Sequence, residues 1–231
     1  MLEIIDITPP VNTSMVIYPG NRELKVWKDL DMAQGDPVNM MSLSSCVHVG
    51  LHVDAESHHY ADGGGVDRLS LDGLIGVGYV MDLTQVETGI SRADLQPLID
   101  ADPFDILLLK TRNSTAKSTW ETFDTEHIFI APDGAECIME LGVKGVALDC
   151  LGVEKYGALE GHTHKILLKD NRLVVFEGVD LRKVLPGYYW FVGLPLKLTG
   201  ADGAPARALL IKDKSGDFLR AWRADKKLIR M

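Results

Sequence analysis

The chain has 231 residues, and 46% of them are hydrophobic, which is ordinary for a globular protein with a sizeable core. Its formal net charge is −9 and it has no basic block, so the sequence disfavours nucleic acids and anionic membrane surfaces as partners. The three cysteines form no C-x-x-C pair and the first residues lack a signal-peptide pattern, so we expect a cytoplasmic protein with free thiols.

Short segments rich in β-branched and aromatic residues, bounded by turn formers, predict a chain made mostly of strands. In chain order these are residues 2–7, 24–27, 41–49, 77–83, 105–110, 145–149, 173–176, 188–193 and 208–212. Helices are predicted at 91–99, 132–141 and 164–169; the first opens on a capping-box pattern, and the second has Pro132 at its start and Gly142 after its end.

Because strands outnumber helices, we expect a mixed α/β domain with a β-rich core and a few flanking helices. No repeat, low-complexity tract or clear linker divides the sequence. We therefore expect one domain over residues 1–231, in which residues 213–231 form a C-terminal extension.

Residues 48–59, HVGLHVDAESHH, concentrate histidines and carboxylates in an otherwise histidine-poor chain. From Val47 to Asp54 apolar and polar residues alternate, which predicts a strand that buries its aliphatic side chains and presents His48, His52 and Asp54 on one face. A half-exposed sheet also shows polar residues on one face, but two further histidines directly after the strand favour a metal site. Imidazole nitrogens and carboxylate oxygens suit Zn²⁺ and Mn²⁺.

The spacing of the first two histidines sets a geometric condition on such a site. In a flat strand, side chains four residues apart lie about 13 Å from each other, at about 3.3 Å per residue. His48 and His52 would hardly meet on one ion across that distance. Gly50 lies between them and permits a kink or bulge, so we expect either a bend at Gly50 or two ions that share the ligands.

The run HVGLHVDAESH at residues 48–58 resembles the H-x-G-T-H-x-D-A-P-x-H signature of the cyclase-like metal-dependent hydrolases, which include bacterial kynurenine formamidase and isatin hydrolase. Further segments are similar to that family: YPG at 18–20, DGGGVDRLSLDGLIG, GVKGVALDCLGVE, HKILL, RLVVFEG and FVGLPLKLTGADGAPARALLI. The resemblance extends to about residue 211. It implies the family's swivelling β/β/α architecture and a homodimer.

Carried over by matching position, the resemblance also implies a set of site residues. The metal ligands would be His48, His52, Asp54, His164 and Glu177. Asp54 would bridge when two ions bind, and His58 would be the proton-transfer residue. The implied cofactor is Zn²⁺ or Mn²⁺, one or two ions per chain.

Two positions depart from the signature. Leu51 replaces the family threonine and continues the inward alternation. Glu56 replaces the family proline; on an extended strand it would share a face with Asp54 and His58, repel anionic substrates and raise the basicity of His58. A glutamate that faces the site would argue against kynurenine formamidase activity in particular. If the chain turns there instead, Glu56 faces solvent.

Other residues compete for roles in the site. His162 competes with His164, and Glu160 with Glu177, although the sequence alignment favours the later residue of each pair. His59 would point away from His58 on a strand and is expected to be exposed. The lesser candidates for substrate binding, besides Glu56, are Tyr18 and Arg112, each with a plainer interpretation as a packing or solvent-facing residue.

The lead hypothesis is a divalent-metal-dependent hydrolase that opens the C–N bond of a small amide, aryl formamide or cyclic amide. The ion would activate a water molecule, and His58 would take its proton and pass it to the departing nitrogen. Lactone or ester hydrolysis at the same site is the alternative reaction. A non-catalytic metal-binding protein is the alternative class; such a site would close its coordination sphere with protein groups. The expected partner is a small-molecule substrate.

Overall fold

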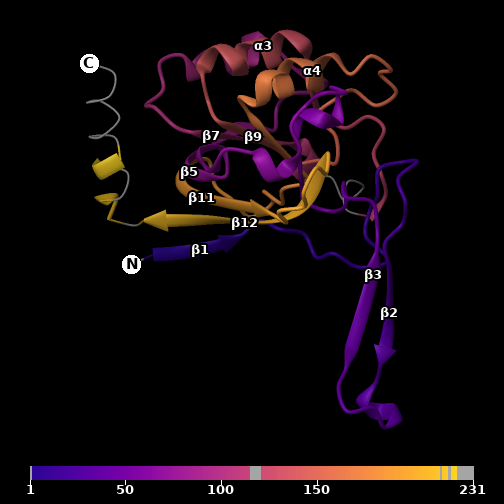
Figure 1. Cartoon of the computed structure of the whole chain (residues 1–231). Helices are drawn as coiled ribbons and strands as arrows, with labels where there is room; N and C mark the ends of the chain where they lie inside the picture. The colour runs from indigo at the N-terminus through magenta and orange to yellow at the C-terminus, as the bar shows by residue number, and fades with distance from the viewer. Residues whose placement is uncertain (1, 115–120, 214, 218–219, 223–231) are drawn as a thin grey trace.

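A computed structural model describes the chain apart from residues 1, 115–120, 214, 218–219 and 223–231 (Figure 1). The extension predicted at residues 213–231 therefore lies largely outside the described residues. The strands are β1 (Leu2–Asp6), β2 (Lys25–Leu30), β3 (Met40–Ser44), β4 (His52–Asp54), β5 (Ile75–Leu83), β6 (Gly89–Ile90), β7 (Ile106–Thr111), β8 (Phe129–Ile130), β9 (Gly145–Leu148), β10 (Val174–Glu177), β11 (Gly187–Pro195) and β12 (Gly203–Asp213). The α-helices are α1 (Arg92–Leu95), α3 (Pro132–Leu141) and α4 (His162–Leu168).

The main sheet closes on itself. Its strand order is β1-β12-β11-β5-β7-β9-β10-β4, and β12 also pairs with β4, which joins the two ends into a barrel and leaves β1 outside as a flanking strand. The pairs β5–β7, β7–β9 and β9–β10 are parallel. The strands β4, β11 and β12 pair antiparallel with their neighbours. The predicted mixed, β-rich fold with few helices is confirmed.

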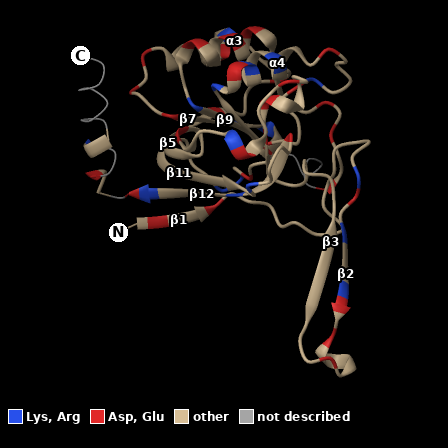
Figure 2. Cartoon of the chain, in the orientation of Figure 1, with Lys and Arg blue, Asp and Glu red and all other residues tan. Residues whose placement is uncertain are grey.

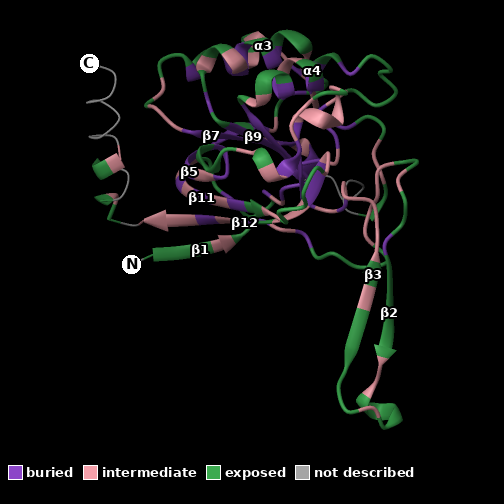
Figure 3. Ribbon diagram, in the orientation of Figure 1, coloured by how far each residue is buried: buried purple, intermediate pink, exposed green. Residues whose placement is uncertain are grey.

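Alternation along the parallel strands builds two apolar layers, because successive side chains point to opposite faces of a sheet. In β7, Ile106 and Leu108 lie in the core inside the barrel, while Leu107 and Leu109 lie in a second core between the sheet and the helices. Phe176 and Phe191 meet edge to face inside the barrel, with ring centroids 5.1 Å apart. Figure 3 shows the buried residues gathered around these layers.

The helices cover one side of the sheet, where α1 packs against α3 and α3 against α4 (Figure 1). The helix α3 occupies the predicted residues, with Pro132 at its first turn and Gly142 in a left-handed conformation after its end. At α1 both hydrogen bonds of the predicted capping box, between Ser91 and Asp94, are present. None of the helices in the described part of the chain has the length and apolar character that a membrane span requires.

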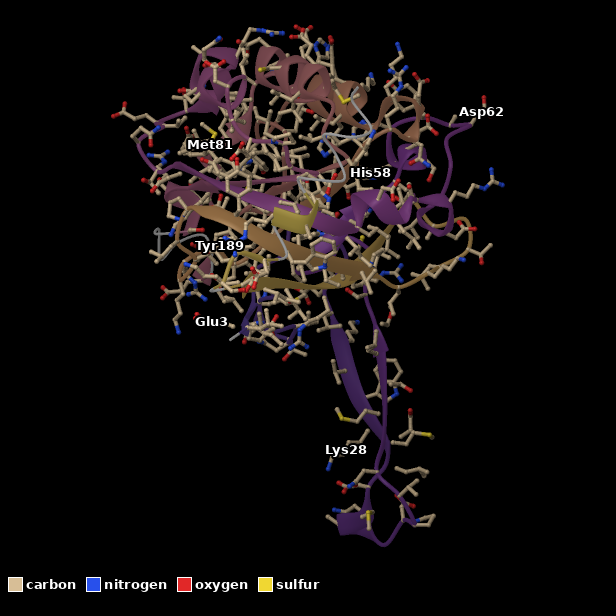
Figure 4. The ribbon with its side chains drawn as sticks, turned by 90° about the vertical axis from the view of Figure 1, so that its left-hand side faces the viewer. Glu3, Lys28, His58, Asp62, Met81 and Tyr189 are labelled. Carbon is tan, nitrogen blue, oxygen red and sulfur yellow. The ribbon has the colours of Figure 1, made fainter. Side chains whose placement is uncertain are left out.

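The strands β2 and β3 form a separate two-stranded hairpin that projects from the body (Figures 1 and 4). In Figure 4, Lys28 on this arm lies far from His58 in the body. Most side chains of the arm are exposed (Figure 3), and acidic and basic residues are interspersed over both the body and the arm (Figure 2).

Three boundaries differ from the predictions. The strand predicted at 41–49 ends at Ser44. Of the strand predicted from Val47 to Asp54, only residues 52–54 form one, the strand β4. The last helix begins at His162 rather than His164. The chain also turns after Asp54 into the short 3-10 helix η2 (Glu56–His58), which breaks the alternation that a strand would continue.

Candidate metal centre

The centre of the site stands on the wall of the barrel that faces the helices. The register of β10 against β4 places Glu177 directly opposite His52, and Asp54 lies two residues further on the same face. Between them Val53 and Phe176 turn into the barrel core. The alternation read from the sequence therefore gives the correct faces in β4, with polar groups on one side and aliphatic groups on the other.

The expected bend at Gly50 is present. Gly50 has φ +59°, a left-handed conformation that glycine adopts without a side-chain clash. The turn brings the rings of His48 and His52 to a centroid separation of 5.1 Å, far closer than a flat strand would allow. His164 joins them from the first turn of α4, where it is 8% exposed. All five ligands expected from the resemblance thus meet in one place.

Each of the three histidines has one ring nitrogen anchored and the other directed at the carboxylates. His52 Nδ1 bonds the carbonyl of Gly50 at 2.9 Å, and its Nε2 lies 3.3 Å from Glu177 Oε2. His164 Nδ1 bonds Glu154 at 3.1 Å, and its Nε2 lies 3.3 Å from Glu177 Oε1. Anchoring of one nitrogen by a carbonyl or carboxylate is the usual support for a metal-ligating histidine, because it fixes the tautomer of the ring.

His48 repeats this arrangement. Its Nε2 lies 3.0 Å from Asp202 Oδ2, and its Nδ1 lies 2.9 Å from Asp54 Oδ1. Although burial lowers the pKa of His48, the hydrogen bonds and charges of Asp54 and Asp202 raise it to about 9.

The two central carboxylates are deeply buried, at 0% exposure for Asp54 and 4% for Glu177. Burial and the charge of Asp54 raise the pKa of Glu177, but hydrogen bonds from His164 and His52 outweigh them and bring it to about 2. Burial likewise opposes ionisation of Asp54, and its neighbouring histidines hold its pKa well below the usual value. Two ionised carboxylates in a buried place require positive charge beside them.

A divalent ion fits this set of donors. Ligand atoms of His52, Asp54 and Glu177 all lie within 4.8 Å of one another, as do those of His48, Asp54 and His58. Asp54 Oδ2 is buried and makes no hydrogen bond to the described residues. A buried carboxylate oxygen without a hydrogen bond is costly unless it meets a cation, and nitrogen and oxygen ligands suit zinc or manganese.

A pocket of about 230 Å³ opens over the centre. His58 lines it, with a side chain that is 30% exposed and a pKa lowered chiefly by burial. Its ring lies 4.2 Å from that of His48 and 5.7 Å from that of His164. Tyr18 also lines the pocket, as the sequence suggested, and contacts Phe123 edge to face.

The structure places two of the lesser candidates elsewhere. Of the two placements left open for Glu56, the structure shows the turn: the chain enters η2 after Asp54, so Glu56 does not share a strand face with Asp54 and His58. Its Oε2 accepts a hydrogen bond from Gly64 N at 3.0 Å. Arg112 donates to the carbonyl of Glu126 at 2.9 Å. Neither is among the described residues that line the pocket.

The competing residues are also resolved by position. His162 points outward, 58% exposed, and pairs with Glu160, so His164 and Glu177 are the members that reach the centre. The exposure expected for His59 is wrong. Its ring stacks on His164 at 4.5 Å and 13°, because η2 turns it inward and Gly161 leaves no side chain in its way.

Two residues that support the histidines were not predicted as site residues, Glu154 behind His164 and Asp202 behind His48 and His58. Both lie in segments similar to the family, GVE and TGADG, but neither carries a local signal that would single out its carboxylate. Only the long-range fold shows which ring each of them meets.

The site is a buried cluster of anchored histidines and carboxylates on a closed barrel, an arrangement suited to a divalent ion. The profile of the Cyclase family, described as “Putative cyclase”, matches residues 5–155. The chain belongs to this family.

Solved structures agree with that assignment. A “potential metal-dependent hydrolase with cyclase activity” is 31% identical, with 93% of this chain and 100% of that chain covered and a TM-score of 0.80. A “predicted metal-dependent hydrolase” from Bacillus stearothermophilus is 32% identical over 92% and 100% of the two chains, with a TM-score of 0.78. Isatin hydrolase A from Labrenzia aggregata shares the fold at 18% identity, over 91% and 93%, with a TM-score of 0.75.

Proposed function

We propose that this protein is a divalent-metal-dependent hydrolase that cleaves the C–N bond of a small amide, aryl formamide or cyclic amide. The observation that carries the proposal is the set of three histidines, His48, His52 and His164, each anchored at one ring nitrogen and directed at Asp54 or Glu177 by the other. Membership of the Cyclase family, and similarity to metal-dependent hydrolases at 31% and 32% identity, support the same class.

These five residues would hold one or two ions of zinc or manganese, with Asp54 placed between the histidines of β4 and α4. When bound, such an ion lowers the pKa of a water molecule towards about 7 and polarises a carbonyl group. Glu177 Oε1 also accepts a hydrogen bond from Val153 N at 2.7 Å, which fixes the carboxylate in the orientation that faces the histidines.

His58 is the residue we assign to proton transfer. Its ring lines the pocket beside His48, and burial lowers its pKa, so it is neutral and able to accept a proton near pH 7. It would take the proton of the attacking water and deliver it to the departing nitrogen. An amine is a poor leaving group without that proton, so His58 should affect turnover more than ion retention.

Beyond the proposed ion and the histidines around it, the described lining of the pocket offers no cation to a substrate carboxylate, so we infer a small substrate without a net negative charge. The described lining includes Tyr18, Leu151 and Leu159, together with histidines and the carboxylates of Glu154 and Glu177, and contains no lysine or arginine. Tyr18 contacts the rings of Phe123 and Tyr156, and an aromatic cluster of this kind suits an aryl group on the substrate. The isatin hydrolases that share the fold are named for a cyclic amide substrate, which points the same way.

A substrate panel tests the proposal. Purified protein is loaded with zinc or manganese and assayed against a neutral aryl formamide, a cyclic amide, a carboxylate-bearing formamide and a lactone. We expect the neutral amides to be hydrolysed fastest. Preference for the lactone would assign ester cleavage instead, and loaded protein that hydrolyses none of the four would favour a non-catalytic metal-binding role.

We propose in addition a cytoplasmic homodimer. The three cysteines, Cys46, Cys137 and Cys150, are all free, which suits a reducing compartment. The β2–β3 arm exposes Val26, Met41 and Leu43 although a two-stranded hairpin alone is marginally stable. A second copy of the chain is the partner that would cover it.

A further inference from the structure

Asp202 lies at the end of the loop that leads into β12, next to the metal centre. Its carbonyl accepts a hydrogen bond from Ala55 N at 2.9 Å, and the following Gly203 is paired with Asp54 in the β12–β4 ladder. Gly203 also packs so closely on His48 that an added Cβ would lie 2.7 Å from the ring. The backbone of Asp202 is therefore held against the end of β4, and its side chain, which is 46% exposed, extends from a fixed position.

One oxygen of this carboxylate meets two histidines. Asp202 Oδ2 lies 3.0 Å from His48 Nε2 and 3.3 Å from His58 Nδ1. The two rings lie 4.2 Å apart with an interplanar angle of 34°. An ionised carboxylate only accepts hydrogen bonds, so each of these ring nitrogens carries the proton and donates it.

We propose that Asp202 is a positioning residue that fixes the tautomers of His48 and His58 together. With its proton on Nδ1, neutral His58 keeps Nε2 free to exchange a proton in the pocket. With its proton on Nε2, His48 keeps Nδ1 for the centre that it shares with Asp54. This inference rests on the proposed function, because it assigns Asp202 a role in presenting His58 to substrate.

The other groups around His58 do not fix its tautomer. The rings that contact His58 are those of His48, His59 and His164, which pack against it through their faces and edges. Among the described residues, Asp202 is the hydrogen-bond partner that the structure gives to the imidazole ring of His58. Without that acceptor a neutral imidazole is free to carry its proton on either nitrogen.

The test compares Asp202→Ala and Asp202→Asn with the full-length protein, at saturating metal and with the metal content of each sample measured. Asp202→Ala should lower kcat by about 10- to 100-fold, the range for loss of a supporting group behind a metal-site histidine, with a much smaller change in KM. Asp202→Asn retains an acceptor oxygen and should recover part of the loss. Asp67→Ala is the matched control. Asp67 accepts a hydrogen bond at 2.9 Å from the backbone N of Gly200, which lies in the loop of Asp202, but Asp67 has no hydrogen bond to either histidine.

Two further readouts separate positioning from general damage. In ¹⁵N NMR without substrate, wild-type His58 should show the Nδ1–H tautomer, and Asp202→Ala should shift it towards a mixture, whereas Asp67→Ala should not. In the His58→Ala background, Asp202→Ala should cost a smaller factor than in the wild type, because the part of its effect that acts through His58 is already lost and only the part through His48 remains.

The inference is overturned if the tautomer of His58 is the same with and without Asp202, or if Asp202→Ala costs the same factor in both backgrounds. Since the NMR readout needs no turnover, it remains decisive even if wild-type protein hydrolyses no amide, an outcome that would count against the proposed function alone.

Discussion

At the scale of single residues, the site separates groups that would hold an ion from one that would move a proton. The His58 side chain is more exposed than those of His52 and Glu177; its ring packs on that of His48, and its Nδ1 meets Asp202. His58→Ala should therefore keep its metal and lose about 10²- to 10⁴-fold in kcat, the usual contribution of a general acid–base group. Elemental analysis and steady-state kinetics on one preparation measure both.

The control for that variant is His162→Ala, which removes an exposed imidazole two residues before His164. It should change neither metal content nor kcat. An inactive His58→Ala protein that has also lost its ion would contradict the division of roles.

The charged cluster also predicts how metal-free protein responds to pH. The folded-state pKa of His48 is about 9, above the ordinary value of 6.5, and those of His52 and His164 are raised as well. A raised pKa stabilises the folded state fully below pH 6.5, and this contribution is lost as pH rises through the folded value.

The free energy of unfolding of chelated protein should consequently fall between about pH 6.5 and 9, with His48 alone contributing on the order of 3 kcal/mol. Metal-loaded protein should resist this loss, since ion binding competes with protons and strengthens as pH rises. Urea unfolding of both forms across that range is the measurement. Constant or rising stability of the chelated form would argue against the charged histidine cluster.

Whether a site residue could be predicted from the sequence depends on how far along the chain its contacts lie. Alternation alone identified the face of β4 that carries His52 and Asp54, because residues two apart share a face of a strand; it also placed His48 there, but His48 lies before the bend at Gly50 and outside the strand. His164 and Glu177 followed only from the resemblance to a family. Asp202 was not predicted, because its contact with His48 spans 154 residues and leaves no periodic signal.

At the scale of elements, Gly50 decides whether the ligands converge. Its left-handed φ of +59° costs a residue with a side chain about 1–2 kcal/mol, and an added Cβ would lie 3.1 Å from Val11. Gly50→Ala should lower stability by that amount and also weaken metal affinity, because the bend between His48 and His52 shifts. Thermal unfolding and a metal titration measure the two effects.

Gly142→Ala provides the comparison, since Gly142 has φ +69° at the end of α3, with nothing near an added Cβ and no contact with the centre. It should lose similar stability and keep its metal affinity. Equal metal affinity in Gly50→Ala and Gly142→Ala would refute a role for the bend.

Elements with strong end signals were predictable, and short ones were not. Pro132 and Gly142 mark both ends of α3, and the predicted bounds agree with the structure. The turn η2 has only three residues and follows an alternating run, so strand parity misplaced His59 and left the placement of Glu56 open. Too few residues lie between Asp54 and the turn for a periodic pattern to reveal the change.

At the scale of the whole molecule, the barrel positions the site and the arm extends away from it. Closure joins β4 to β12, strands about 150 residues apart in the sequence, and composition and local pattern carry no record of such a pairing. On the arm, Val26, Met41 and Leu43 share one face, because Val26 is paired with Leu43 and Lys28 with Met41. Their exposed fractions are 40%, 62% and 70%.

If a second copy covers this face, then Met41→Asp combined with Leu43→Asp should convert a dimer to a monomer in size-exclusion chromatography with light scattering. Burial of a charge in an apolar contact is unfavourable, which is the reason for the expected dissociation. Leu71→Asp is matched in type and exposure, at 66% exposed on the body, and should leave the dimer intact. A wild-type protein that is monomeric at all concentrations would disprove this assembly.

The account as a whole depends on ion binding by the buried carboxylates and anchored histidines. The most direct measurement is the metal content of wild-type protein and of Asp54→Ala after loading with zinc or manganese and removal of free ion, with circular dichroism to confirm that the variant is folded. We expect one or two tightly held ions per wild-type chain and a marked loss in the variant. Wild-type protein that retains no divalent ion, or a folded Asp54→Ala that retains as much, would contradict the account.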